Sequence, residues 1–343
     1  MQKLLKPFFI CIVLAFGTFI ATAQQPMEKK KQKNPNGAFS KFIGGFSLHA
    51  STGFGMTFFS HEIQGPGILQ QKDGNVYLFD NFYVIGGDSL NTGYTGWTNN
   101  AQSSSNIPIG DEDFLLGTDT LAIKYKGAGG SIPFSVAVSY TFDRYRFGGG
   151  VTYEQSFAAK YYPNALTNDL QPFKTDFVTS SITRYYGYVG GEVFRSIRHT
   201  IAIDAMIGTF KYGKKKFNPD QIKYKLFVNI GVSFERSLSE YFKVFVRPSL
   251  EIKRYELTIP GLNYALTHSA PAMYFSIGAI IRIPDLNKCP VSQCHSQINH
   301  RHGGNVYRSK MHPFWKWQNP NYGQNYPQLI KYKGKNKKKK NPY

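Results

Sequence analysis

The chain has 343 residues, of which 18% are charged, 16% are aromatic and 33 are glycine. This much aromatic material excludes a disordered protein, and the lack of a ~20-residue apolar run beyond the N-terminus excludes a bundle of membrane helices. The formal net charge is +20, but residues 284–343 alone hold ten Lys and two Arg against one acid. A nucleic-acid-binding domain would more plausibly concentrate Lys and Arg on its folded face, so we expect no nucleic-acid partner.

The N-terminus carries a secretion pattern. Two lysines precede an apolar run from Phe8 to Ile20, and Ala21-Thr22-Ala23 fits a small-x-small cleavage site. The pattern predicts a signal peptide over residues 1–23, whereas a membrane anchor would need a longer apolar run. Residues 24–38 are polar and basic without an apolar period, and we interpret them as a periplasmic linker.

Residues 39–283 contain eight segments in which apolar and polar side chains alternate. A period of two over this length predicts β-strands that each have one apolar face. In the first segment Phe46, Leu48, Phe54 and Met56 share one face. The eight segments are 42–58, 131–142, 146–157, 177–194, 201–207, 222–235, 242–252 and 273–283.

The connections between these segments alternate in length. Short turns are expected near 143–145, 195–199 and 237–240, and long connections at 61–130, 159–176, 213–221 and 258–270. Short turns on one side and long loops on the other are typical of an outer-membrane barrel. An even number of strands then places both termini on the short-turn side, in the periplasm.

The polarity of the two faces decides what lies inside such a barrel. A soluble barrel of the lipocalin kind has its apolar residues inside, but here one face collects the charges and the other has almost none. We therefore predict an all-β, eight-stranded antiparallel transmembrane β-barrel. Its apolar face would contact outer-membrane lipid and lipopolysaccharide. Because Val76 to Ile85 also alternate, a ten-stranded barrel is the alternative.

An eight-stranded barrel has an interior just filled by side chains, and buried charges persist there by pairing. We predict a lumen charge network that would exclude an open diffusion pore, with Lys225 and Arg282 as further cations. No Gly-x-Ser-x-Gly, His-Glu-x-x-His or phosphate loop occurs, so we expect no catalytic residue, no enzyme and no cofactor. The predicted network is Glu154, Arg184, Glu192, Asp204, Arg247 and Glu251.

The long connection 61–130 is acidic, with eight carboxylates against three lysines. Its Asp111-Glu112-Asp113 run offers the oxygen ligands that hard divalent cations prefer. The spacing matches no calcium loop, and a solvated surface is the favoured interpretation. A receptor or adhesin that acts through this loop is an alternative function.

Residues 284–343 form a basic tail with two cysteines and a histidine cluster. Cys289 and Cys294 could form a disulfide, which the oxidising periplasm favours. The alternative is a metal site, for which the candidate ligands are Cys289, Cys294, His295, His300 and His302. The aromatic stretch that follows has no helical period and is typical of a segment that orders on a partner. We expect a periplasmic protein partner for this tail.

The chain resembles small outer-membrane β-barrel proteins of Bacteroidota over residues 1–283. Ala23-Gln24-Gln25 after the predicted signal and the Tyr-, Phe- and Gly-rich strands carry this resemblance. A single barrel with a basic, cysteine-containing tail is also similar to barrel components of the type IX secretion and gliding machinery. The resemblance implies a non-enzymatic barrel that anchors or organises a periplasmic or secretion-related complex through its tail.

Overall fold

The computed structural model describes residues 42–80, 84–85, 89–117, 122–157, 160–175, 177–196, 198–261, 265–283, 286–294, 296 and 299–309. Its described residues belong to two compact units, a barrel unit over 42–283 and a tail unit over 286–309. The predicted signal peptide (1–23) and linker (24–38) lie outside the described residues. Within the described ranges, no helix is both long and apolar enough to cross a membrane.

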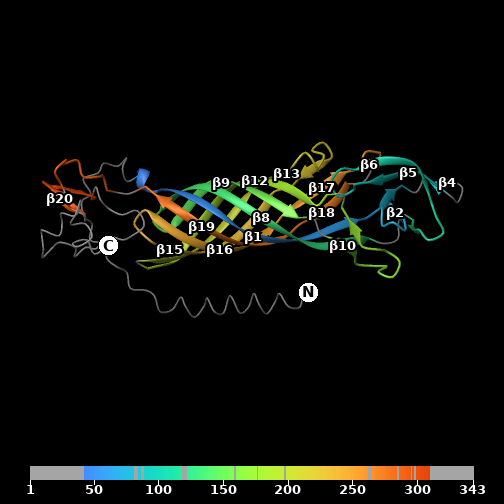
Figure 1. Cartoon of the computed structure of the whole chain (residues 1–343), viewed down its shortest axis with the longest axis horizontal. Coiled ribbons are helices and arrows are strands. Elements are labelled where there is room, and N and C mark those ends of the chain that lie inside the picture. Colours follow the sequence, from blue (N-terminus) through green and yellow to red (C-terminus); the bar gives the residue numbers. More distant parts are fainter. Residues whose placement is uncertain are drawn as a thin grey trace, which may run out of the picture. The chain divides into compact units, whose positions relative to one another are not determined.

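Eight antiparallel strands close into a barrel, as the alternation predicted (Figure 1). The ring closes because β1 pairs with β19 on one edge and with β8 on the other. Neighbouring strands around the ring follow each other in the order β8-β9-β12-β13-β15-β16-β19-β1. The strands are β1 (Phe46–Ile63), β8 (Ile123–Phe142), β9 (Tyr145–Phe157), β12 (Thr179–Arg195), β13 (His199–Tyr212), β15 (Phe227–Ser237), β16 (Phe242–Ile252) and β19 (Ala272–Arg282).

The predicted segment 222–235 is not continuous. The structure breaks it into β14 (Ile222–Tyr224) and β15, with Lys225 and Leu226 between them. Lys225 therefore does not enter the lumen network, because its side chain lies at the surface and pairs with Glu256. This corrects the expectation that Lys225 faces the barrel interior.

An apolar belt surrounds the outside of the barrel. On β1 it runs from Leu48 to Met56 and on β8 from Ile132 to Phe142, which matches the 9–11 residues that a tilted strand needs to cross a bilayer. Exposed apolar area of this extent is far larger than the patches that soluble monomers tolerate. Among the belt's exposed side chains are Leu48, Phe54, Met56, Phe134, Val136, Val138, Tyr153, Ile203, Ile207, Ile230, Phe275 and Ile277.

The connection 61–130 folds into a sheet of its own rather than an irregular loop, beyond one end of the barrel (Figure 1). The Val76 to Ile85 stretch supplies two strands of this sheet, so it does not enlarge the barrel to ten strands. We call this sheet the cap. Its strands are β2 (Gly67–Gln70), β3 (Val76–Phe79), β4 (Val84–Ile85), β5 (Ser89–Thr95), β6 (Gln102–Pro108) and β7 (Phe114–Leu116).

Short strands extend the barrel sheet beyond the belt: β10 (Lys160–Pro163), β11 (Phe173–Lys174), β14, β17 (Arg254–Thr258) and β18 (Ala265–Ser269). A buried apolar cluster joins them to the cap, and we call it the cap core. Its members include Ile63, Ile68, Leu78, Trp97, Tyr125, Tyr161, Phe210, Tyr255, Leu257 and Leu266.

The tail unit is built around a small hairpin of β20 (His300–His302) and β21 (Asn305–Tyr307). Gly303 occupies the turn with φ of 59°, a left-handed conformation that glycine adopts without strain. Lys288 bridges to Arg308, and the Cys289 amide donates to the Arg308 carbonyl at 3.1 Å. The segment that carries the cysteines is therefore held beside the hairpin.

Candidate functional site

The barrel interior holds three layers of ion pairs, each made by side chains from several strands. In the layer nearest the short turns, Arg146 of β9 lies between Glu192 and Glu235. Lys243 also contacts Glu235, with 3.0 Å between Nζ and Oε2. Both carboxylates of this layer therefore have cationic partners, although neither is adjacent to Arg146 in the sequence.

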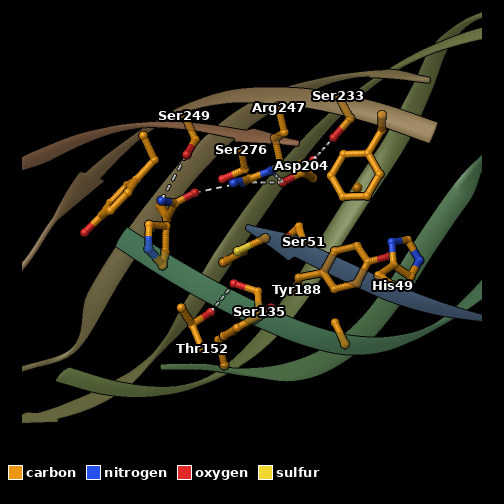
Figure 2. Close-up of a pocket in the computed structure, with 18 of the residues that line it drawn as sticks. His49, Ser51, Ser135, Thr152, Tyr188, Asp204, Ser233, Arg247, Ser249 and Ser276 are labelled. Carbon is orange, nitrogen blue, oxygen red and sulfur yellow. Dashed lines mark hydrogen bonds and ion pairs between the residues drawn. The ribbon is translucent and has the colours of Figure 1, made fainter. Parts of the chain in front are cut away.

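The middle layer is centred on Arg247 of β16. Its guanidinium donates to Asp204 of β13 at 2.5 Å and to the Asn229 side-chain carbonyl at 2.8 Å, and Ser233 donates to the same Asp204 carboxylate at 2.9 Å (Figure 2). Gly231 makes this arrangement possible, because a Cβ there would lie 2.5 Å from the Arg247 guanidinium carbon.

The third layer lies toward the cap and contains two cations and two anions. Arg184 pairs with Glu154 at 2.6 Å and also with Glu251. Lys253 lies 3.3 Å from Glu251 and donates to the Tyr274 hydroxyl at 3.0 Å. Lys253 is only 1% exposed and Glu154 is 0% exposed, so this layer is a fully buried ion cluster.

The structure places all six side chains of the predicted network in the interior, and it adds five partners that the predicted network omitted: Arg146, Glu235, Lys243, Lys253 and Tyr274. Four of them occupy the inward phase of their strands, and Lys253 follows the end of β16 in the same phase, so alternation alone could have identified them as interior groups. Which charge meets which depends on the stagger between strands. That stagger cannot be read from one strand at a time.

The space left between the layers is small. A cavity of about 80 Å³ remains, bordered by His49, Ser135, Tyr188, Asp204 and Arg247 (Figure 2). This volume is enough for a few water molecules and far below the 300–1,000 Å³ typical of a small-molecule site. The arrangement can hold the barrel together, but it leaves no room for an organic solute.

A histidine pair lies in the cap core, beyond the apolar belt. His61 of β1 and His268 of β18 face each other across a register pair, with 2.8 Å between their Nδ1 atoms. Burial lowers the pKa of His61 to about 3, and burial together with the neighbouring His61 lowers the pKa of His268 well below its usual value. Both imidazoles are therefore neutral near pH 7, and one donates to the other. The sequence showed the two histidines without indicating that they meet.

The acidic run of the cap is engaged in local contacts. The Asp113 carboxylate accepts from the amides of Gly110 at 2.8 Å and Lys72 at 3.0 Å. The Lys72 ammonium in turn lies 2.5 Å from Glu112. These exposed contacts fasten the turn before β7 to the turn before β3.

The structure brings together four of the five candidate metal ligands of the tail unit. One ligand atom from each of Cys289, Cys294, His300 and His302 lies within 4.8 Å of the other three. No disulfide joins the two cysteines in this structure. His295 lies outside the described residues. The predicted disulfide thus stays a prediction. His300 and His302, which are not adjacent to the cysteines in the sequence, lie close to both sulfurs in the structure.

Searches for related proteins found no matching family model and no matching curated protein. Among solved structures, the outer-membrane protease OmpT from Escherichia coli matches with 9% identity and a TM-score of 0.32, covering 70% of this chain and 97% of that one. The β domain of the Bordetella autotransporter BrkA matches with 11% identity and a TM-score of 0.23, covering 68% and 100%. A Pseudomonas aeruginosa FadL homologue matches with 9% identity and a TM-score of 0.21, covering 73% and 92%. These matches define no family for the chain, and its class follows from its own geometry.

Proposed function

We propose that this chain is a non-enzymatic outer-membrane barrel whose sealed interior makes it an anchor rather than a channel. The observation that carries the proposal is the combination of an apolar belt outside and fully paired charges inside. Apolar residues facing outward and polar residues facing inward are the polarity of a barrel in lipid. The belt would contact outer-membrane lipid and lipopolysaccharide.

The chain's path supports a periplasmic position for the tail. The last barrel strand ends where the first begins, since Arg282 pairs with Ser47. That edge also carries the short turns after Phe142, Arg195 and Ser237. In outer-membrane barrels the short turns face the periplasm, so residues 284–343 would leave the barrel on that side.

The tail's composition indicates what the anchor would hold. Its twelve basic residues against one acid would attract an acidic protein face. Such an attraction is screened over about 8–10 Å at physiological salt, so the partner has to contact the tail directly. The resemblance of this barrel-plus-tail organisation to components of type IX secretion machinery favours a secretion-related complex as that partner.

In-cell crosslinking with affinity recovery tests the proposal. The full chain is compared with a chain stopped after Ile283, which retains every barrel strand. We expect the truncated chain to insert normally, as judged by heat-modifiable gel mobility, and to recover its periplasmic partner at least tenfold less. Equal recovery from both chains would refute the proposal.

The cap is the second candidate for a working surface. Its folding into a sheet with a buried core favours this candidate, because a rigid surface loses little entropy when it binds a ligand. Deleting residues 65–125 from the full chain should abolish ligand or cell binding if the cap is the receptor. Partner recovery through the tail should then be unchanged.

A further inference from the structure

Within residues 286–309, the part of the tail unit that the structure describes, little apolar material is buried. Neither buried apolar cluster of the protein contains a described residue of the tail, and Val291 is 40% exposed. Small units without a hydrophobic core generally need a disulfide or a metal ion to stay folded. The described part of the tail nevertheless has a hairpin, a bridge between Lys288 and Arg308, and a turn that ends at Cys294.

The cysteines and histidines of this unit converge from three separate pieces of chain. Cys289 is 2% exposed and follows the bridge to the hairpin. Cys294 ends a turn, since its amide donates to the Val291 carbonyl at 3.1 Å. His300 and His302 are two residues apart on β20, which places both rings on one face of the strand. Their ring centroids are 4.8 Å apart, at 88° between planes.

The ligand atoms themselves face a common point. The Cys294 Sγ lies 3.0 Å from the His300 Nε2. The His302 Nε2 is buried without a hydrogen-bond partner among the described residues. A metal ion at this point would use all four groups.

We propose that Cys289, Cys294, His300 and His302 bind one zinc ion as a closed structural site. Two thiolates and two imidazoles are a ligand set that tetrahedral zinc takes. Zinc bonds of ~2.3 Å to sulfur and ~2.0–2.1 Å to nitrogen require ligand atoms about 3.3–3.8 Å apart. The four atoms lie within 4.8 Å of one another, and the Cys294 Sγ and His300 Nε2 are 3.0 Å apart. Shifts of less than about 1 Å, some inward and some outward, would bring them to these separations.

The chemistry of loading is simple. Each cysteine thiol releases its proton as its sulfur bonds to zinc, each imidazole donates a lone pair, and no electron is transferred. The ion would fix the cysteine segment against the hairpin and so give the tail a defined surface. This site is independent of the anchoring role, because zinc can bind whether or not the tail holds a partner.

The test uses the full chain in detergent, reduced, loaded with one equivalent of zinc and freed of unbound metal. We expect about one zinc per chain by elemental analysis, and at least tenfold less in two double variants: Cys289→Ser with Cys294→Ser, and His300→Gln with His302→Gln. The matched control is His199→Gln, an exposed histidine of the barrel unit, which should retain the full zinc content. Unchanged heat-modifiable mobility verifies that every variant has a folded barrel.

Two further readouts make the outcome decisive. Cobalt in place of zinc should give the intense thiolate-to-metal absorption of a tetrahedral site, and both double variants should lose it. Intact mass after alkylation distinguishes thiols from a disulfide in protein taken from its own membrane without reductant. A Cys289–Cys294 disulfide in that protein, or zinc content unaffected by the double variants, would overturn the proposal.

Discussion

Replacing Arg184 with methionine is expected to destabilise the barrel by about 3–5 kcal/mol, because removing one partner of a buried ion pair leaves its counter-charges uncompensated. Arg184 is the shared partner of Glu154 and Glu251 in the third lumen layer. After the substitution only Lys253 would remain to balance two buried carboxylates. The measurement is urea unfolding in lipid vesicles, followed by heat-modifiable mobility.

Two companion variants separate this effect from ordinary loss of a salt bridge. Lys124→Met breaks a surface pair with Glu62, in which both side chains are more than a third exposed, and should cost no more than about 1 kcal/mol. Adding Glu154→Gln alone to Arg184→Met leaves one buried carboxylate, Glu251, opposite one buried cation, Lys253, at 3.3 Å, and should recover most of the lost stability. A loss below 1 kcal/mol for Arg184→Met alone would show that the lumen charges are solvated rather than buried.

Acidification is expected to open the cap through His61 and His268. Both are buried and neutral in the folded cap, with the pKa of His61 lowered to about 3 and that of His268 also lowered. In an opened cap each would titrate near its ordinary pKa of ~6.5. Below pH 6.5 the opened state therefore binds more protons than the closed state. Each histidine then lowers the stability of the closed cap by about 1.4 kcal/mol for every pH unit of acidification. Between pH 7 and pH 5 the two histidines together should therefore lower the stability of the closed cap, relative to the opened cap, by about 4 kcal/mol.

Trp97 reports this opening directly, since its ring lies 6.1 Å from His61 and 6.5 Å from His268, centroid to centroid. The other two tryptophans, Trp315 and Trp317, are replaced by phenylalanine so that the signal has one source. We expect a red shift of Trp97 emission between pH 7 and pH 5. Replacing both histidines with leucine should remove the pH dependence, and a shift that persists in this variant would assign the opening to other groups.

How much the sequence revealed depended on how strongly each segment was constrained by its surroundings. The barrel strands were readable because lipid on one side and paired charges on the other impose a strict period of two. The same logic identified Glu154, Arg184 and Asp204 as interior groups. It could not identify the ion pair between Arg146 and Glu235, because contacts between distant strands depend on the stagger of the closed ring.

The cap and the ends of strands were the least predictable parts. The cap strands β2 and β7 have four and three residues, too few for alternation to stand out from chance. The alternation at Val76 to Ile85 was visible, but it belongs to β3 and β4 of the cap and not to the barrel. The extension of β1 to Ile63 and the start of β8 at Ile123 were missed. At these ends apolar side chains such as Ile63, Ile123 and Tyr125 face inward to the cap core rather than outward, so the polarity of the two faces is reversed there. In the tail, Cys-x4-Cys followed by His-x-His was visible, but the hairpin turn at Gly303 and the bridge between Lys288 and Arg308, which holds the cysteine segment beside the hairpin, were not.

Single-channel recording in a planar lipid bilayer tests most directly whether this barrel is sealed. The full chain, verified as folded by heat-modifiable mobility, is added at increasing concentration beside a diffusion porin as the positive control. We expect insertion without stepwise conductance, because three layers of ion pairs occupy the lumen and the cap core covers one end. Uniform, sustained conductance steps from the folded chain would contradict this expectation and would identify a channel rather than an anchor.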